Sequence, residues 1–228
     1  MNRKIEYLFP DSEIMIFTKA PEIGESKTRI AQTTGLELAA SFSGRLIEHA
    51  VKTVVDASLA PVSIWVADKP DHPFIQSLIS NYPLSVFPQT DGTLGDRMSN
   101  ALDTRLASKH SVVLIGSDCP FINRPYLLST LTQLKHDRDI VIGPAEDGGY
   151  VLIGLRKNDK RLFENIAWSQ DSVMQQTRKQ VDQCGYRLFE LDMLSDIDYF
   201  EDIQRWQPLI TSVPALQEWL QNSGETDG

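Results

Sequence analysis

Short apolar runs alternate with amphipathic stretches along the chain. The runs Glu13–Thr18, Pro61–Ala67 and Val112–Ile115 are each followed by polar or turn-forming residues, which is typical of buried strands. Val112–Ile115 is apolar throughout, as expected for a strand covered on both faces. Between Gly35 and Ala57, apolar residues recur at three- and four-residue spacing, which predicts one face of a long helix.

The alternation continues to the end of the chain. Further helices are expected over residues 74–79, 95–107, 124–134, 171–183 and 200–206, and near 215–220. Further strands are expected over 84–87, 139–142, 149–155 and 186–191. The strand at 149–155 follows a Gly-Gly turn that leaves no room for a helix before it. Strands alternating with helices predict an α/β protein with a mainly parallel sheet.

The pattern predicts one domain over residues 1–228, with 1–12 as a loosely attached leader and 208–228 as a C-terminal tail. A chain of 228 residues matches the usual size of a single domain, and it contains no internal repeat or low-complexity linker. Parallel sheets bind ligands beyond the carboxyl ends of their strands. Polar residues directly after strands are therefore the best candidates for a site.

Composition limits the partners. The chain has 22 Lys and Arg against 31 Asp and Glu, a net charge of −9, which argues against a nucleic-acid or anionic membrane surface. One small basic pocket for a phosphorylated ligand is still compatible with this charge. Cys119 and Cys184 are far apart, and there is neither a signal-peptide core nor an apolar run of membrane-spanning length. We expect a reduced, cytoplasmic protein, with a homodimer left open.

Three cations follow the first predicted strand. Lys19, Lys27 and Arg29 lie within eleven residues, in a loop that also contains Pro21 and Gly24. Gly24 would let backbone N–H groups approach a phosphate, while the cations supply charge and donors. The spacing is not that of a Walker A loop. A phosphate-binding loop and a solvated basic loop are the two interpretations.

Acidic residues follow two later strands. Asp118 comes just after the apolar strand at 112–115, where a carboxylate can bind Mg²⁺ or Mn²⁺ beside a diphosphate, or cap the next helix. Glu146 and Asp147 precede Gly148 and Gly149, which could form a simple turn or approach an acceptor, with a carboxylate as ligand or general base.

Other candidates carry weaker signals. Asp196 and Asp198 belong to an acidic cluster before a helix, and N-capping accounts for only one of its acids. Trp168 could stack on a base or sugar or belong to the core. A glycine-spaced segment before a helix could hold an anion, or its acid could favour the helix dipole. This segment contains Gln89, Gly92, Gly95, Asp96 and Arg97. Cys119 has no histidine near it in sequence and is expected to fill core space.

Five motifs, taken together in this order, resemble one family. They are Lys19-x-Pro21-x-x-Gly24-x-x-Lys27-Thr28-Arg29-Ile30, Gln89-x-x-Gly92-x-Leu94-Gly95-x-Arg97-Met98, Gly116-Ser117-Asp118-Cys119-Pro120, Gly143-Pro144-Ala145-Glu146-Asp147-Gly148-Gly149-Tyr150 and Asp196-Ile197-Asp198. The chain is similar over about residues 13–206 to uncharacterised bacterial GT-A-like nucleotide-diphospho-sugar transferase proteins, often named as glycosyltransferases and sometimes linked to arsenosugar pathways. It resembles the 2-phospholactate guanylyltransferases more faintly.

The resemblance implies a Rossmann-like three-layer α/β/α sandwich with a mixed, mostly parallel sheet and a bound Mg²⁺ or Mn²⁺. It places Asp118, Asp198 and Asp196 at the metal. It assigns a nucleotide- and phosphate-binding role to Lys19, Pro21, Gly24, Lys27, Thr28, Arg29, Gly92, Gly95 and Arg97. It also implies catalytic roles for Asp147 and Lys27, and an acceptor- or sugar-binding role for Glu146, Gly148, Gly149 and Trp168.

This sequence departs from related patterns at three points. The GGxGxR signature of common sugar nucleotidyltransferases is absent, the DxD motif is reduced to Asp118 at the central strand, and Tyr199 stands where Thr often follows the late aspartate. We expect a glycosyltransferase that uses a nucleotide-diphospho-sugar and a small-molecule acceptor. The alternatives are a nucleotidylyltransferase that releases pyrophosphate and a non-catalytic nucleotide-binding protein.

Overall fold

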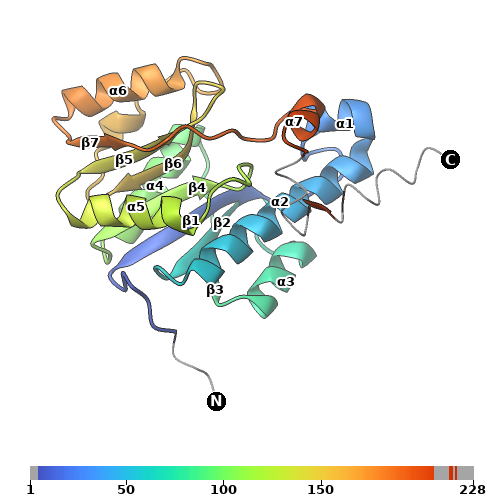
Figure 1. The fold of residues 1–228 in the computed structure, drawn as a ribbon, viewed down its shortest axis with the longest axis horizontal. Coiled ribbons are helices and arrows are strands. Elements are labelled where there is room, and N and C mark those ends of the chain that lie inside the picture. The colour runs from blue at the N-terminus through green and yellow to red at the C-terminus, as the bar shows by residue number, and fades with distance from the viewer. Residues whose placement is uncertain (1–4, 208–215, 218, 220–228) are drawn as a thin grey trace.

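A seven-stranded sheet forms the centre of the computed structural model, which describes residues 5–207, 216, 217 and 219 (Figure 1). The strand order is β3-β2-β1-β4-β6-β5-β7. The strands are β1 (Ser12–Lys19), β2 (Val62–Ala67), β3 (Leu84–Pro88), β4 (Ser111–Gly116), β5 (Ile140–Pro144), β6 (Tyr150–Leu155) and β7 (Leu188–Glu190). The helices are α1 (Thr28–Thr34), α2 (Leu36–Ala57), α3 (Pro73–Asn81), α4 (Leu94–Leu106), α5 (Arg124–Lys135), the 3-10 helix η1 (Lys160–Phe163), α6 (Val173–Gln183) and α7 (Phe200–Arg205).

Among the described strands, only β6 runs against the others. It is antiparallel to β4 and to β5, whereas every other pairing is parallel. The cause is the tight turn between β5 and β6, in which Ala145 N–H donates to Gly149 O at 3.0 Å and Gly148 has a φ of 87°. A turn this short can only join antiparallel strands. The carboxyl ends of β1, β3, β4 and β5 therefore meet along one edge of the sheet.

Alternating side chains of β1 feed two cores, one on each face of the sheet. Ile14 and Ile16 pack with α2, α3 and α5, while Met15 and Phe17 pack with α4, η1 and α6. This is the period-two alternation of a strand covered on both faces. The expected α/β/α sandwich with a mixed, mostly parallel sheet is confirmed.

A third apolar cluster joins α1, α2 and α7 beyond the carboxyl edge of the sheet, and Figure 1 shows α7 beside α1. Its buried members include Ile30 of α1, Phe42 of α2 and Ile203 of α7, together with Leu216 and Trp219. The indole Nε1 of Trp219 donates to Leu38 O at 3.2 Å. This cluster fixes α1, and with it the basic segment after β1.

Most expected elements match the observed bounds within two residues, but two helices were missed. Thr28 and Arg29, expected in a loop, begin α1, and η1 was not predicted. The helix expected near 215–220 falls mainly outside the described residues, of which 216, 217 and 219 are helical. Phe9, inside the expected leader, donates its N–H to Leu59 O at 2.8 Å. Among the described residues, no helix is long and apolar enough to cross a bilayer.

Candidate functional site

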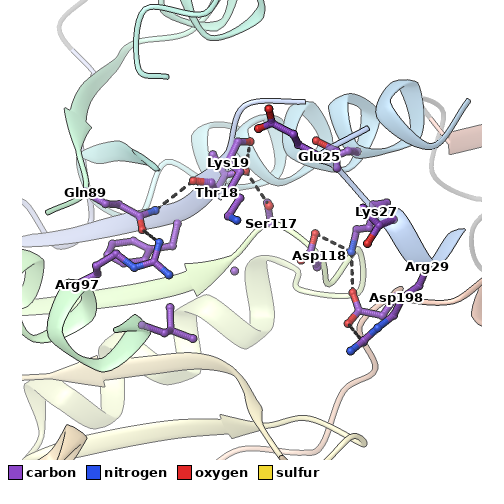
Figure 2. Close-up of a pocket in the computed structure, with 16 residues that line it drawn as sticks. Thr18, Lys19, Glu25, Lys27, Arg29, Gln89, Arg97, Ser117, Asp118 and Asp198 are labelled. Carbon is purple, nitrogen blue, oxygen red and sulfur yellow. Dashed lines mark hydrogen bonds and ion pairs between the residues drawn. The ribbon is translucent and has the colours of Figure 1, made fainter. Parts of the chain in front are cut away.

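A cavity of about 440 Å³ opens at the carboxyl edge of β1 and β4. Figure 2 shows Gln89 and Arg97 at one end, the Thr18–Ser117 pair in the middle, and Lys27, Arg29, Asp118 and Asp198 at the other end. Of the residues assigned by resemblance to nucleotide or metal binding, the lining includes Lys19, Lys27, Thr28, Arg29, Arg97, Asp118 and Asp198. The loop after β1 and the late Asp198 thus meet in one hollow.

Lys27 lies at the centre of the acidic end. Its Nζ is 2.9 Å from Asp118 Oδ1 and 2.9 Å from Asp198 Oδ1, and it donates to Ile197 O at 2.6 Å. The Lys27 side chain is 7% exposed, while that of Asp118 is 49% exposed. Burial by itself would lower the pKa of Lys27, but the charges of Asp118 and Asp198 raise it above its ordinary value. The ammonium therefore stays charged inside the site.

The backbone places Lys27 by an unusual turn. Lys27 is the N-cap of α1 and has φ 46° and ψ 47°, in the left-handed region that non-glycine residues seldom adopt. Gly24, earlier in the same segment, has φ 84°. Two residues after Lys27, Arg29 Nη1 reaches Asp198 Oδ2 at 3.3 Å. Strain of this kind is tolerated where the surroundings fix the geometry, and it is common at functional sites.

At the opposite end, the chain anchors a glutamine and presents an arginine. Gln89 Nε2 donates to Thr18 O at 3.1 Å and to Trp65 O at 2.8 Å, and Gln89 Oε1 accepts from Arg97 Nη1 at 2.9 Å. Arg97 Nε is buried and has no hydrogen-bond partner in the part of the chain that the structure describes. A buried N–H without a partner is costly, so this guanidinium is suited to a ligand that brings an acceptor.

Asp147 and Asp196 lie outside the cavity. Asp147 Oδ1 accepts from Gly149 N–H at 2.8 Å, so this carboxylate closes the turn between β5 and β6. Burial raises the pKa of Asp196 to about 6, and the charges of Asp147 and Asp198 add to the rise. Asp196 does not join Asp118 and Asp198 in a metal-binding cluster, since the described part of the chain contains no suitable group of three or more His, Cys, Asp or Glu.

The residues expected at an acceptor are dispersed. Glu146 faces a second cavity of about 700 Å³ and pairs with Arg205 of α7 at 2.9 Å. Gly148 lies so close to the Asp171 backbone that a Cβ would overlap it. Trp168 packs on Gly95, where an added Cβ would lie 2.8 Å from its ring. For Gly148 and Trp168, the contacts support the structural interpretation.

Four residues of the expected nucleotide set do not line the cavity, and one of them, Gly24, has no atom of the described residues other than its chain neighbours within 4 Å of where a Cβ would lie. Pro21 lines a shallow hollow beside α2 and α3, Gly92 packs against Asp96, and Gly95 packs against Trp168. Asp96 forms a capping box with Thr93 at the start of α4. Cys119 is 3% exposed and burial raises the pKa of its thiol to about 12, which agrees with a core-filling role.

Several cavity residues were not singled out from sequence. Thr18 and Ser117 end neighbouring parallel strands, and their hydroxyl oxygens are 3.1 Å apart across the cavity floor. Gln89 was noted only as part of a motif. All three are polar residues at the carboxyl end of a strand, and this position is the sequence signal that could have identified them.

The residues fit a divalent cation only in part. Asp118 and Asp198 direct one oxygen each toward a single point, and carboxylates together with substrate phosphates are the usual ligands of Mg²⁺. That point is held by Lys27 Nζ. The chain thus offers two carboxylate ligands, and the lysine has to move before a cation can use both.

The sheet order and this cavity define a protein with the fold of nucleotide-sugar transferases and nucleotidylyltransferases. The chain belongs to the family described as "Uncharacterized protein conserved in bacteria (DUF2064)", whose model matches residues 50–170. No curated protein matches the sequence.

Solved structures agree on the fold. A "putative nucleotide-diphospho-sugar transferase" from Desulfovibrio desulfuricans G20 is 25% identical with a TM-score of 0.77, covering 92% of this chain and 98% of that one. CMP:2-keto-3-deoxy-manno-octonic acid synthetase complexed with CTP is 11% identical, TM-score 0.57, with 88% and 98% covered. Rv0371C of Mycobacterium tuberculosis H37Rv, in complex with manganese, is 13% identical, TM-score 0.51, with 86% and 97% covered.

Proposed function

We propose that this protein is a metal-dependent glycosyltransferase that takes its sugar from a nucleotide-diphospho-sugar. The observation that carries the proposal is the union, in one cavity, of the cations Lys27 and Arg29 with the carboxylates Asp118 and Asp198. Cations suit a diphosphate, and paired carboxylates suit the divalent ion that accompanies it. In a chain of net charge −9, this local group of cations would suit one small anion and not an extended polyanion.

The comparisons support this class of donor. The Desulfovibrio protein, similar over almost the whole of both chains, is described as a "putative nucleotide-diphospho-sugar transferase". One more distant neighbour was solved with CTP and another with manganese. Because these two proteins are less than 25% identical to this chain, their similarity supports the fold alone. Other proteins of this fold thus carry a nucleotide or a divalent cation.

The two ends of the cavity suit different parts of a nucleotide. Arg97 has a buried donor without a partner among the described residues, and Leu94 and Phe17 line the same cavity, which suits the flat, partly apolar nucleobase. Lys19, Lys27 and Arg29 would neutralise the phosphates. Mg²⁺ or Mn²⁺, held by Asp118 and Asp198, would stabilise the negative charge of the departing nucleoside diphosphate. The cations of the chain stabilise the same charge, which is electrostatic catalysis.

Asp147 is the proposed base for the acceptor hydroxyl. Its Oδ1 accepts from the Gly149 N–H in the β5–β6 turn and its Oδ2 has no hydrogen-bond partner among the described residues, so one oxygen is left to accept a proton. The adjacent Glu146 lines the second cavity, and in this proposal the acceptor binds on that side of the β5–β6 turn. The acceptor is a small molecule in this proposal.

Nucleotidylyl transfer is the second candidate, and the position of Asp147 favours it. Asp147 lies outside the cavity lining and serves a turn, and a phosphate nucleophile needs no general base. In this version the acceptor phosphate attacks the α-phosphorus of a nucleoside triphosphate, and pyrophosphate leaves. The same cations and carboxylates would serve both reactions.

A thermal-shift screen tests the proposal. The protein is scanned with nucleoside triphosphates and nucleotide-sugars, with and without Mn²⁺, because a ligand that binds the folded state raises the midpoint. We expect a nucleotide-diphospho-sugar with Mn²⁺ to give the largest shift, and D118N to abolish it. A larger shift with a triphosphate would favour nucleotidylyl transfer. No shift with any nucleotide would refute both.

A further inference from the structure

Three oxygen atoms surround the Lys27 ammonium, in the way that ligands surround a metal ion. The ammonium has three N–H donors, and three oxygens receive them, from Asp118, Asp198 and the Ile197 carbonyl. The side chain is almost completely buried. No donor is left for a phosphate while this arrangement lasts. The lysine expected to bind phosphate is thus occupied by the two carboxylates expected to bind metal.

A divalent cation and this ammonium cannot share the position. A Mg²⁺ ion bonds carboxylate oxygens at about 2.0–2.1 Å, so an ion on both Oδ1 atoms would lie almost on Nζ. The positive charges would also repel each other strongly at that distance. Arg29 adds to the competition because it contacts the other oxygen of Asp198 at 3.3 Å. In these contacts, Asp118 Oδ2 is the one carboxylate oxygen of the pair that has no cation beside it.

The surroundings favour release of Lys27 toward the cavity. The residue lines the cavity, and Asp118, on one side of it, is half exposed. Its backbone has left-handed dihedrals at the start of a short helix, with no side-chain cap to the helix. A di- or triphosphate would offer Nζ several oxygens of higher charge than the carboxylates it leaves.

We propose that Lys27 is the resident cation of the Asp118–Asp198 pair and keeps it from binding a divalent metal until a nucleotide phosphate draws the lysine away. Metal and nucleotide then bind together, and without a nucleotide the Asp118–Asp198 pair binds no divalent metal at physiological metal concentrations. The exclusion of metal stands on the contacts of Lys27 alone, whereas the release by phosphate rests on the proposed function.

The test measures Mn²⁺ binding to the nucleotide-free protein from the EPR signal of the free ion. The wild type is compared with K27M and with K27M/D198N, and K52M serves as the matched control. Lys52 also pairs with an aspartate, Asp56, at 2.6 Å, but on the surface. We expect K27M to bind Mn²⁺ at least ~10-fold more tightly than wild type, K52M to match wild type, and K27M/D198N to lose the gain.

Equal Mn²⁺ affinity of wild type and K27M would overturn the proposal. Should K27M fail to fold, the wild type decides: Mn²⁺ binding that D118N abolishes would refute exclusion, and binding insensitive to D118N would support it. Release is tested with inorganic pyrophosphate, which should create D118N-sensitive Mn²⁺ binding in the wild type. A protein that excludes Mn²⁺ but shows no nucleotide binding keeps the first part and loses the proposed function.

Discussion

Arg97 Nη1 donates to Gln89 Oε1 at 2.9 Å, and this bond holds the guanidinium at the edge of the cavity with its Nε–H unused. Gln89 is itself fixed by the carbonyls of Thr18 and Trp65, the ends of two neighbouring strands. The sheet thereby sets the direction of a donor that belongs to helix α4. A ligand acceptor placed there would remove the cost of an unpaired buried donor.

Replacing Arg97 by lysine should weaken nucleotide binding about 10-fold, because lysine keeps the charge but loses the planar fork of donors. Isothermal titration with the nucleotide that gives the largest thermal shift measures the change. R178K is the matched control, since Arg178 pairs with Glu190 at 2.8 Å on the surface away from the cavity. Unchanged affinity in R97K would show that Arg97 does not contact the nucleotide.

The D147N variant separates the two candidate reactions. Asparagine keeps a carbonyl oxygen for the Gly149 N–H, so the β5–β6 turn should persist, but it cannot accept the acceptor's proton. Sugar transfer should slow about 100-fold or more, while nucleotidylyl transfer should change little. The release of nucleoside diphosphate and of pyrophosphate is measured for the wild type and for D147N. An unchanged melting temperature shows that the turn is intact, and full activity in D147N would exclude Asp147 as the base.

The R105M variant should lower the free energy of unfolding by about 3–5 kcal/mol, because it leaves a buried carboxylate without its counter-ion. Glu13 of β1 is 2% exposed and accepts from Arg105 Nε at 2.9 Å and from Ser63 Oγ at 2.6 Å. Urea denaturation gives the value. R178M, which breaks an exposed pair, should cost no more than ~1 kcal/mol. Equal losses in the two variants would contradict this account.

Asp139 should make stability depend on pH. Burial acts to raise its pKa, but hydrogen bonds from the Arg187 side chain and backbone bring it below the ordinary 3.8. A depressed carboxyl pKa stabilises the fold above the unfolded pKa, and this stability is lost as the pH falls through the folded value. D139N should therefore be less stable than wild type at pH 7. Denaturation curves recorded from pH 7 downward should converge below pH 3.8.

D103N, which changes an exposed acid of α4, serves as the control for D139N. The free energy of unfolding of D103N should change with pH in the same way as that of the wild type across this pH range. A D139N deficit that persists unchanged at pH 2–3 would mean that the loss comes from packing and not from the charge.

Apolar periodicity was sufficient for the sheet and its covering helices, since burial dictates it directly. It did not predict α1, whose sequence TRIAQTT is rich in β-branched threonine and isoleucine. This helix forms because Ile30 is buried against α2 and α7, a tertiary contact that no local pattern encodes. The reversed strand β6 followed from the Gly148-Gly149 turn.

The sequence indicated which residues belong to the candidate site but not which contacts they make with each other. Lys27, Asp118 and Asp198 each follow a strand or precede a helix, so their meeting at one edge could be expected. The direct bonds from Lys27 to the two acids join segments far apart in the sequence, since Asp118 lies 91 residues after Lys27 and Asp198 lies 171 residues after it. Trp168 and Gly95 show the limit in the other direction. Gly95 stood in a motif and Trp168 was a candidate for stacking on a base or sugar, but their contact with each other indicates core packing.

The sequence separation of Lys27 and Asp198 has a consequence for synthesis. A ribosome translates the 171 positions that separate these two residues before the second carboxylate exists, and α7 and Trp219, which help fix α1, come later still. On a nascent chain, the segment after β1 therefore has neither its full set of charge partners nor its packing. The cavity is complete only when these late segments have folded, so a stalled or shortened chain would carry the residues after β1 and β4 without the finished cavity.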